Sequence, residues 1–403
     1  MSSPWWTAGS GAVRREGRGP AADPAPATGP ARSAAYAAAV SSDHDAPHRQ
    51  QPTLLEAVAG LEAVAAAGDD DRFGPALALV GGLFGSAGPA EAAAAGPRLA
   101  ALLPGAPPFP RAHLAMVVGA CVENGADPVG CAGPVLAGLH GALTGTQRLT
   151  RRWAQTGGGP LPDPEGDDPV EAHDRVADPA HLDAWHAHLA VVGWWTLHLW
   201  QRAAWAVYAH PPVRREARTS GVTDVLLELF ERYDGGRHDF KGLAHLALVL
   251  DDEPLLVLDR PTGTGYLLRM DGLGDTFQLH TLLAEVLIGG GHLPGTRPDP
   301  EVVALARTAL PDDRRVVATG AFNLVAPDGS WLWNEGTPSD IPVVDGVRTL
   351  VLDPPPYERS WSAGRLLQEV PGDLRLERVL PPAEAAQRLA RTVPAQPAEQ
   401  AFR

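Results

Sequence analysis

The sequence predicts an α+β protein in which a helical N-terminal part, built as helix hairpins or as a bundle, precedes a smaller α+β module. Two observations predict this division, a change of apolar period along the chain and the length of the chain. Apolar residues recur at helical spacing from Thr53 to about residue 250, and beyond residue 253 they form short runs separated by turns. The length of 403 residues exceeds what one hydrophobic core usually serves, so we expect two folded domains.

The first 50 residues are expected to form a disordered tail. They are rich in Gly, Ala, Pro and Ser and cannot bury enough apolar surface to offset the entropy lost on ordering. Trp5-Trp6 is a candidate docking peptide within this tail, and a tail without function is the simpler interpretation. Residues 394–403 are expected to be a second disordered tail.

The helical domain is predicted to span residues 51–253. Thr53-Leu54-Leu55-Glu56 fits a capping box, and a later helix begins near Pro110 and closes at Asn124-Gly125. Asp127-Pro128 then caps the next helix. Glycines that could end helices recur with a period of about twenty residues, at Gly68, Gly88, Gly105, Gly125 and Gly145.

A stretch at about 157–178, which contains GGGPLPDPEGDDP, has the composition of an internal linker. Asp178-Pro179 is then predicted to open a long helix that runs to about His210 and carries five tryptophans. This helix is apolar nearly all round, so we expect it to be buried in the protein. A membrane span is not expected, because the central Arg202 would cost about 2.5–3.5 kcal/mol at mid-bilayer.

The α+β module is predicted to span residues 254–393. Asp251-Asp252-Glu253-Pro254 is a poor segment to bury and marks the boundary. Apolar runs at 255–258 and 266–270 flank the turn at 261–265 and predict a β-hairpin.

The rest of this module is predicted to contain helices and strands in an order that the sequence does not define. Helices are expected at 276–287 and after Pro381-Pro382. Further strands are expected at 316–319, 322–325, 331–333 and 347–352.

Charge and cysteine content restrict the partners and the compartment. The formal net charge is -15 and the arginines are scattered, so nucleic acid is not an expected partner. Arg151-Arg152 and Arg214-Arg215 are interpreted as solvated faces. Only Cys121 and Cys131 occur, which fits a reducing compartment and predicts a cytoplasmic protein.

The motif search mainly excludes functions. No Walker A loop, Gly-x-Ser-x-Gly, His-Glu-x-x-His or dinucleotide Gly-x-Gly-x-x-Gly pattern occurs. The histidines of the tryptophan helix include no pair four residues apart, so they are interpreted as packing residues. His173-Asp174 and His238-Asp239 resemble the His-Asp pair of metal phosphohydrolases, but such dipeptides are common by chance. We therefore expect no metal and no cofactor.

Polar residues cluster where the second strand of the hairpin leads into the next helix. Asp275 is the expected N-cap of that helix. The candidate binding residues are Arg269, Asp271, Asp275, Gln278, His280, Trp331, Trp333, Asn334 and Glu335. The structural alternative is that Asp275 caps, His280 packs and the tryptophans fill one face of a sheet.

Around these residues the sequence resembles uncharacterised actinobacterial proteins. The resemblance covers roughly residues 254–393. It is carried by four sequence segments: GTGYLLRM, FQLHTLLAEVLIGG, TGAFNL and WLWNEGTPSDIP. It implies no activity and supports only the interpretation of this part as one unit.

Three functional hypotheses remain open. We favour a non-catalytic interaction or regulatory protein that binds a protein partner through the Arg269 to Glu335 surface. The second is a hydrolase or transferase in which His280 works with Asp275 or Glu335 as acid and base. The third is a small-ligand-binding module with aromatic walls.

Overall fold

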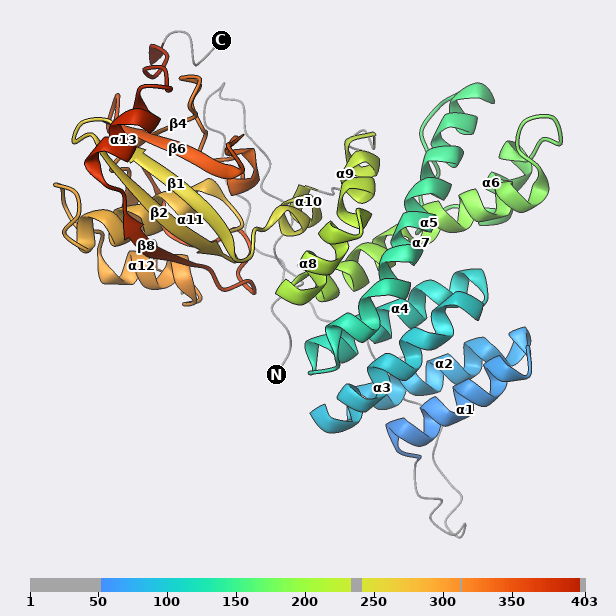
Figure 1. The fold of residues 1–403 in the computed structure, drawn as a ribbon. Helices are drawn as coiled ribbons and strands as arrows, with labels where there is room; N and C mark the ends of the chain where they lie inside the picture. The colour runs from blue at the N-terminus through green and yellow to red at the C-terminus, as the bar shows by residue number, and fades with distance from the viewer. Residues whose placement is uncertain (1–51, 233–240, 312–313, 399–403) are drawn as a thin grey trace, which may run out of the picture. The chain divides into compact units, whose positions relative to one another are not determined.

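A computed structural model of the chain describes residues 52–232, 241–311 and 314–398 (Figure 1). The described residues belong to one compact unit that begins at Pro52. The expected tail at 1–50, with Trp5-Trp6, lies outside the described residues, as does His238-Asp239.

Helices make up the first part of the chain, and a mixed sheet with a few helices makes up the second, so the predicted α+β class is confirmed. The first part contains α1 (Leu54–Ala66), α2 (Asp70–Phe84), α3 (Pro89–Leu102), the short 3-10 turn η2 (Leu103–Gly105), α4 (Pro108–Glu123), α5 (Pro128–Gln155), α6 (Pro169–Val176), α7 (Ala184–Tyr208), α8 (Pro211–Thr219), α9 (Val222–Arg232) and α10 (Lys241–Leu248).

Local capping explains where many of these helices begin. The predicted capping box is present: Thr53 Oγ1 accepts from the Glu56 backbone N–H at 3.2 Å, and the Glu56 carboxylate accepts from the Thr53 N–H at 2.8 Å. Asp127 accepts backbone N–H bonds at the start of α5, as predicted. The same arrangement recurs at Asp69, Asp168, Asp183, Asp275 and Asp299. Part of the acidic composition therefore serves to begin helices.

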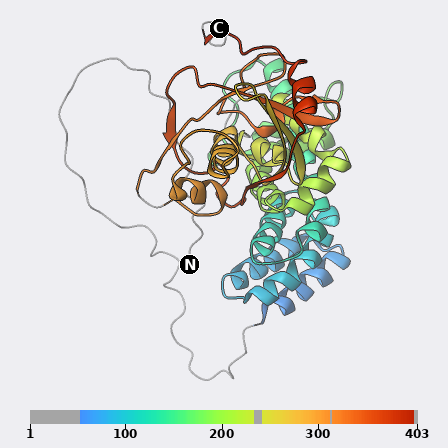
Figure 2. The ribbon, with the colours of Figure 1, turned by 60° about the vertical axis from the view of Figure 1, so that its left-hand side comes forward.

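The first four helices form two hairpins, α1 with α2 and α3 with α4, and these hairpins pack on one another (Figures 1 and 2). The prediction that Gly145 ends a helix is wrong, since Gly145 lies inside α5. A Cβ on Gly145 would lie 2.6 Å from the Leu189 carbonyl oxygen of α7, and one on Gly193 would lie 2.7 Å from the Ala142 oxygen. Both glycines are required because the backbones of α5 and α7 cross in contact.

The segment expected to be a linker is packed against the helices. It contains α6, and two buried tryptophan rings hold the residues before it: Trp153 Nε1 donates to Pro160 O at 3.0 Å and Trp194 Nε1 donates to Pro162 O at 2.9 Å. The acceptors of these hydrogen bonds are backbone carbonyls, which any residue supplies. The amino-acid composition of the segment therefore could not indicate that it is packed.

The long tryptophan helix begins later than predicted. Asp183 caps α7, and Asp178 lies in the preceding turn. Trp194, Trp195 and Trp200 are buried as expected, but Trp185, in the first turn, is 60% exposed. No helix in the described part of the chain is long and apolar enough to cross a membrane.

The second part is built around one mixed sheet. Its order is β4-β6-β1-β2-β8, with β5 also paired to β6; β1 and β6 run parallel and the other pairs are antiparallel. The strands are β1 (Glu253–Asp259), β2 (Thr264–Asp271), β4 (Asn323–Val325), β5 (Val343–Val344), β6 (Val347–Asp353) and β8 (Asp373–Val379). A separate ribbon pairs β3 (Val317–Thr319) with β7 (Ser360–Ser362).

The two faces of the sheet are covered by different helices (Figure 1). Leu255 and Val257 of β1 pack with α11 (Thr276–Leu283), the π-helical η3 (Ala284–Gly289) and α12 (Pro300–Arg307). Leu256 and Leu258 point the other way and pack with Ala385 of α13 (Pro382–Leu389). The predicted β1–β2 hairpin therefore forms the centre of a three-layered module.

Three sequence expectations for this module need correction. Residues 331–333 are not a strand; Trp331 makes a single bridge to Val325, after which the chain turns toward the 3-10 helix η4 (Pro338–Asp340). Strand β8 and helix α12 were not expected. Residues 394–396 are not a free tail, because Gln396 N–H donates to Gly329 O and Trp331 Nε1 donates to Gln396 O, both at 2.9 Å.

The arginine pairs and the acidic boundary segment also differ from expectation. Arg214 is fully buried and forms a bidentate ion pair with Asp251, at 2.8 and 2.6 Å. Arg152 forms an ion pair with Asp178 at 2.8 Å. Within the acidic boundary segment Asp251 is therefore buried while Asp252 is exposed, because α8 provides a buried counter-charge for Asp251 that the local sequence does not reveal.

Candidate functional site

His280 lies on α11 and is completely buried between aromatic rings. The rings of Phe322 and Trp361 lie 5.8 and 5.1 Å from its own, centroid to centroid. Its Nε2 accepts the backbone N–H groups of Ala321, at 2.9 Å, and Phe322, at 3.2 Å. The ring proton is therefore on Nδ1, which makes a long 3.5 Å hydrogen bond to Asn334 Oδ1.

The surroundings of His280 keep the imidazole neutral. Burial is the main cause, and the positive charge of Arg359 adds to it; together they lower the pKa of His280 from 6.5 to about 4, although the Asn334 hydrogen bond opposes the shift. With its only lone pair already used by two backbone donors, this ring is poorly placed to act as a general base.

Asp275 and Gln278 hold the start of α11 in place. Asp275 accepts backbone N–H bonds from Gln278, at 2.7 Å, and Leu366, at 2.9 Å. Burial raises the pKa of Asp275, and these hydrogen bonds offset part of the effect. The Gln278 side chain accepts from Gly274 N–H at 3.0 Å and donates to Ala306 O at 2.8 Å. Both buried side chains are thus hydrogen-bonded to backbone groups.

Arg269 and Asp271 do not join this group. Side chains alternate along a strand, and Leu268 and Met270 belong to the core beneath α11, so Arg269 and Asp271 point to the opposite face of the sheet. There Arg269 forms an ion pair with Glu377 at 2.8 Å, and Asp271 forms one with Arg375 at 3.0 Å. The sheet itself separates them from His280.

The remaining candidates lie along the loop that follows β4. Asn334 is buried against His280, and Glu335, in the same turn, is exposed. Trp331 is buried, whereas Trp333 is 38% exposed; the two rings lie 5.6 Å apart. The nine predicted residues thus divide into a buried group at α11, an ion-paired group across the sheet and a loop with one exposed ring, and they form no single cleft.

Replacing His280 by glutamine tests its structural role through pH. Because the pKa of His280 is lower in the folded chain, the unfolded chain binds more protons between pH 6.5 and 4, and stability is lost as the pH falls through this window. The shift corresponds to about 3 kcal/mol. We expect His280→Gln to remove most of this acid-induced loss, measured by urea unfolding at pH 7 and pH 4.

His113→Gln, at an exposed histidine of α4, is the control and should keep the wild-type pH dependence. If His280→Gln also keeps it, the buried imidazole does not carry this effect.

Two pockets lie in the helical part, where the sequence indicated no site. The first is a groove of about 280 Å³ between α5, α8 and α9. Its buried lining residues include Leu136, Val213 and Leu226, and Glu216 and His140 are exposed at its rim. Its residues are Ala132, Gly133, Leu136, Ala137, His140, Val213, Glu216, Ala217, Ser220, Gly221, Val222, Val225 and Leu226. The only sequence signal for this groove was the alternation of small and larger apolar residues along α5.

The second pocket, also of about 280 Å³, lies between α4, α6 and α7 and is lined by Phe109, Pro169, Val170, His173, His188 and Val191. The indole of Trp185 stacks on His188, with ring centroids 5.9 Å apart. Within the described residues, no group of three or more His, Cys, Asp or Glu side chains could hold a metal ion.

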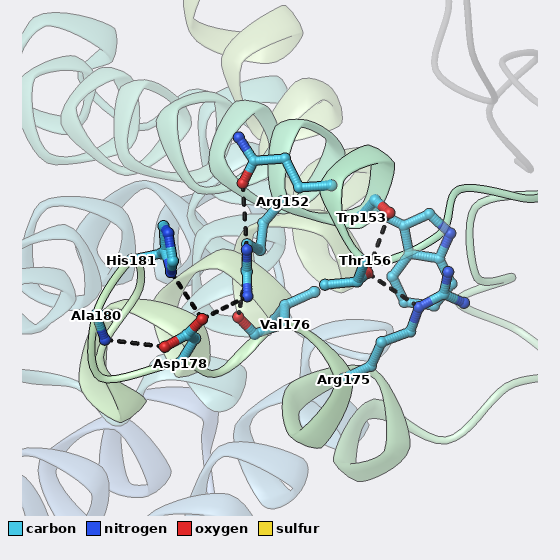
Figure 3. A network of polar contacts seen from close by, with 9 residues as sticks. Arg152, Trp153, Thr156, Arg175, Val176, Asp178, Ala180 and His181 are labelled. Carbon is cyan, nitrogen blue, oxygen red and sulfur yellow. Dashed lines mark hydrogen bonds and ion pairs between the residues drawn. The ribbon is translucent and has the colours of Figure 1, made fainter.

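A polar network fixes α6 beside this pocket (Figure 3). The Arg175 guanidinium lies 3.6 Å over the Trp153 ring and donates to Thr156 Oγ1 at 3.2 Å. Asp178 accepts from Arg152 at 2.8 Å and pairs with His181 at 2.7 Å. These contacts attach the C-terminal end of α6, and the turn that follows it, to α5.

The fold and the sites described above are those of a helical protein with an attached α+β module and concave apolar surfaces in the helical part. The chain matches no family model, no curated protein and no solved structure. The resemblance of residues 254–393 to actinobacterial proteins stays a prediction.

Proposed function

We propose that this protein is a non-catalytic interaction protein that binds an amphipathic helix of a partner in the α5–α8–α9 groove. The observation that carries the proposal is this exposed apolar groove, which contrasts with the fully occupied polar groups around His280. Helix-in-groove binding requires a concave apolar surface that accepts side chains spaced by three or four residues.

The shape of the groove suits a helix. Four small residues line the groove, so a helix backbone can approach closely at these positions: Ala132, Gly133 and Ala137 on α5 and Ala217 on α8. Val225, which is 44% exposed, provides an apolar contact at the edge. A helix with leucine or phenylalanine at every third or fourth position matches this surface.

The rim suggests the charge of the partner. Glu216 is exposed at the edge of the groove, and the chain carries a net charge of -15. A partner helix with Lys or Arg beside its apolar face is therefore favoured in orientation and association rate. Catalysis by His280 with Asp275 or Glu335 is the less favoured alternative, because both ring nitrogens of His280 are already hydrogen-bonded.

Photo-crosslinking tests this proposal. With p-benzoylphenylalanine in place of Val225, we expect a cross-linked partner peptide that has apolar residues at i, i+3 or i+4, and i+7, beside basic residues. Gly133→Leu should fill the groove and lower the cross-linking yield about tenfold or more, since a 1.4 kcal/mol loss of affinity is tenfold. A Cβ at Gly133 meets no atom within 4 Å, so the fold accepts the substitution.

Gly60→Leu on α1 is the matched control, since a Cβ there also meets nothing within 4 Å. It should leave the yield unchanged. Cross-linking that persists in Gly133→Leu, or a captured segment without an apolar helical stripe, would contradict the proposed function.

A further inference from the structure

The pocket between α4, α6 and α7 has the features of a small-molecule site, separate from the groove. We infer that it binds a small planar aromatic molecule that carries one hydroxyl or ring N–H group. The inference rests on the aromatic arrangement around His188, on the size of the pocket and on the fixed position of α6. It does not depend on the proposed function, since no residue lines both pockets.

The aromatic arrangement defines where a ring would bind. Phe109 meets His188 edge to face, with centroids 6.4 Å apart and planes inclined by 73°. Trp185 stacks on His188 from the same helix face, with planes inclined by 26°. Phe109 and His188 both line the pocket, and Val170 and Val191 complete an apolar wall. Aromatic side chains in such offset and edge-to-face geometries favour a further aromatic ring.

The two histidines that line the pocket, His173 and His188, differ in their hydrogen bonds. His173 Nε2 bonds to Ala184 O at 3.2 Å, and its Nδ1 faces Asp174 at 3.3 Å, so both nitrogens are used. His188 makes ring contacts in the described part of the chain and no hydrogen bond. Its imidazole can therefore form one hydrogen bond with a hydroxyl or ring N–H group of a ligand.

Size limits the ligand to one or two rings. At about 280 Å³, the pocket lies just below the range of roughly 300–1,000 Å³ that is typical of drug-sized ligands. The network around Arg175 and Asp178 holds the C-terminal end of α6 against α5 (Figure 3), and the hydrogen bond from His173 to Ala184 O holds the middle of the helix against α7. The wall formed by α6 is thus in place before a ligand arrives, and less entropy is lost on binding.

The binding of phenol and cyclohexanol to the full chain tests this inference, with affinities measured by ligand-observed NMR. The two probes share a six-membered ring and a hydroxyl group, and only phenol can stack. We expect phenol to bind at least about tenfold more tightly, a difference of about 1.4 kcal/mol. His188→Phe keeps an aromatic ring and removes the hydrogen bond. It should therefore weaken phenol binding about three- to tenfold and leave the affinity for toluene unchanged.

Val170→Trp should fill the pocket and abolish phenol binding, because Val170 is 62% exposed at its edge. Val379→Trp, at an exposed valine of β8, is the control and should bind phenol like wild type. Equal binding of phenol and cyclohexanol, or equal behaviour of the two tryptophan variants, would overturn the inference. Gly133→Leu should leave phenol binding intact, so failure of the groove proposal and failure of this one are distinguishable.

Discussion

Arg214→Ala is expected to lower the free energy of unfolding by about 3–5 kcal/mol, the usual cost of breaking a buried ion pair by removing one partner. The Arg214 side chain is 0% exposed and that of Asp251 is 1% exposed, so the remaining carboxylate would be left in the core without a counter-charge. Arg214 also donates to Tyr208 O at 2.7 Å. Urea unfolding of the full chain at pH 7 measures the loss.

The neighbouring exposed Arg215 provides the matched control, and Arg215→Ala should change stability by no more than about 0.5 kcal/mol. The double variant Arg214→Met, Asp251→Leu removes both charges and should recover most of the loss, because apolar replacements of buried ion pairs are often neutral. A single variant as stable as wild type would show that the pair is not buried as described.

Trp200→Ala is expected to cost about 3–5 kcal/mol, because it leaves a cavity at the centre of the helical core. Trp200 is 4% exposed on α7, and its ring packs on Gly138 of α5, where a Cβ would clash with it. Chemical denaturation followed by circular dichroism gives the difference.

Trp185→Ala, on the same helix, is the control. Its ring is 60% exposed, so stability should stay within about 0.5 kcal/mol of wild type. Equal effects of the two substitutions would mean that α7 does not pack on α5 as the structure shows.

The candidate site could be predicted only where it depends on neighbouring residues. Asp275 is the helix cap that its position before Thr276 indicated. Arg269 and Asp271 were grouped with His280 because they are near in sequence, yet the alternation with Leu268 and Met270 already places them on the other face of the strand. A stricter use of the two-residue period would have excluded them.

The two helical pockets were not predictable in the same way. Their walls come from helices that are far apart in the sequence, such as α4 and α7 or α5 and α9. Each wall on its own is an ordinary set of alanines, valines and histidines. Only the packing of the helices makes them concave.

The sequence by itself determined the features that depend on a few consecutive residues: the change from helical to strand period near residue 253, the capping box at Thr53, the aspartate caps and the β1–β2 hairpin. Capping and periodicity act within one or two turns, so the local sequence contains them.

Tertiary structure decided which charges are buried and which surfaces are hollow. Arg214 and Asp251 are 37 residues apart, and Gly145 is needed only where α7 crosses α5. The free energy of a buried charge or of a close backbone contact depends on a partner from elsewhere in the chain, and one sequence does not name that partner.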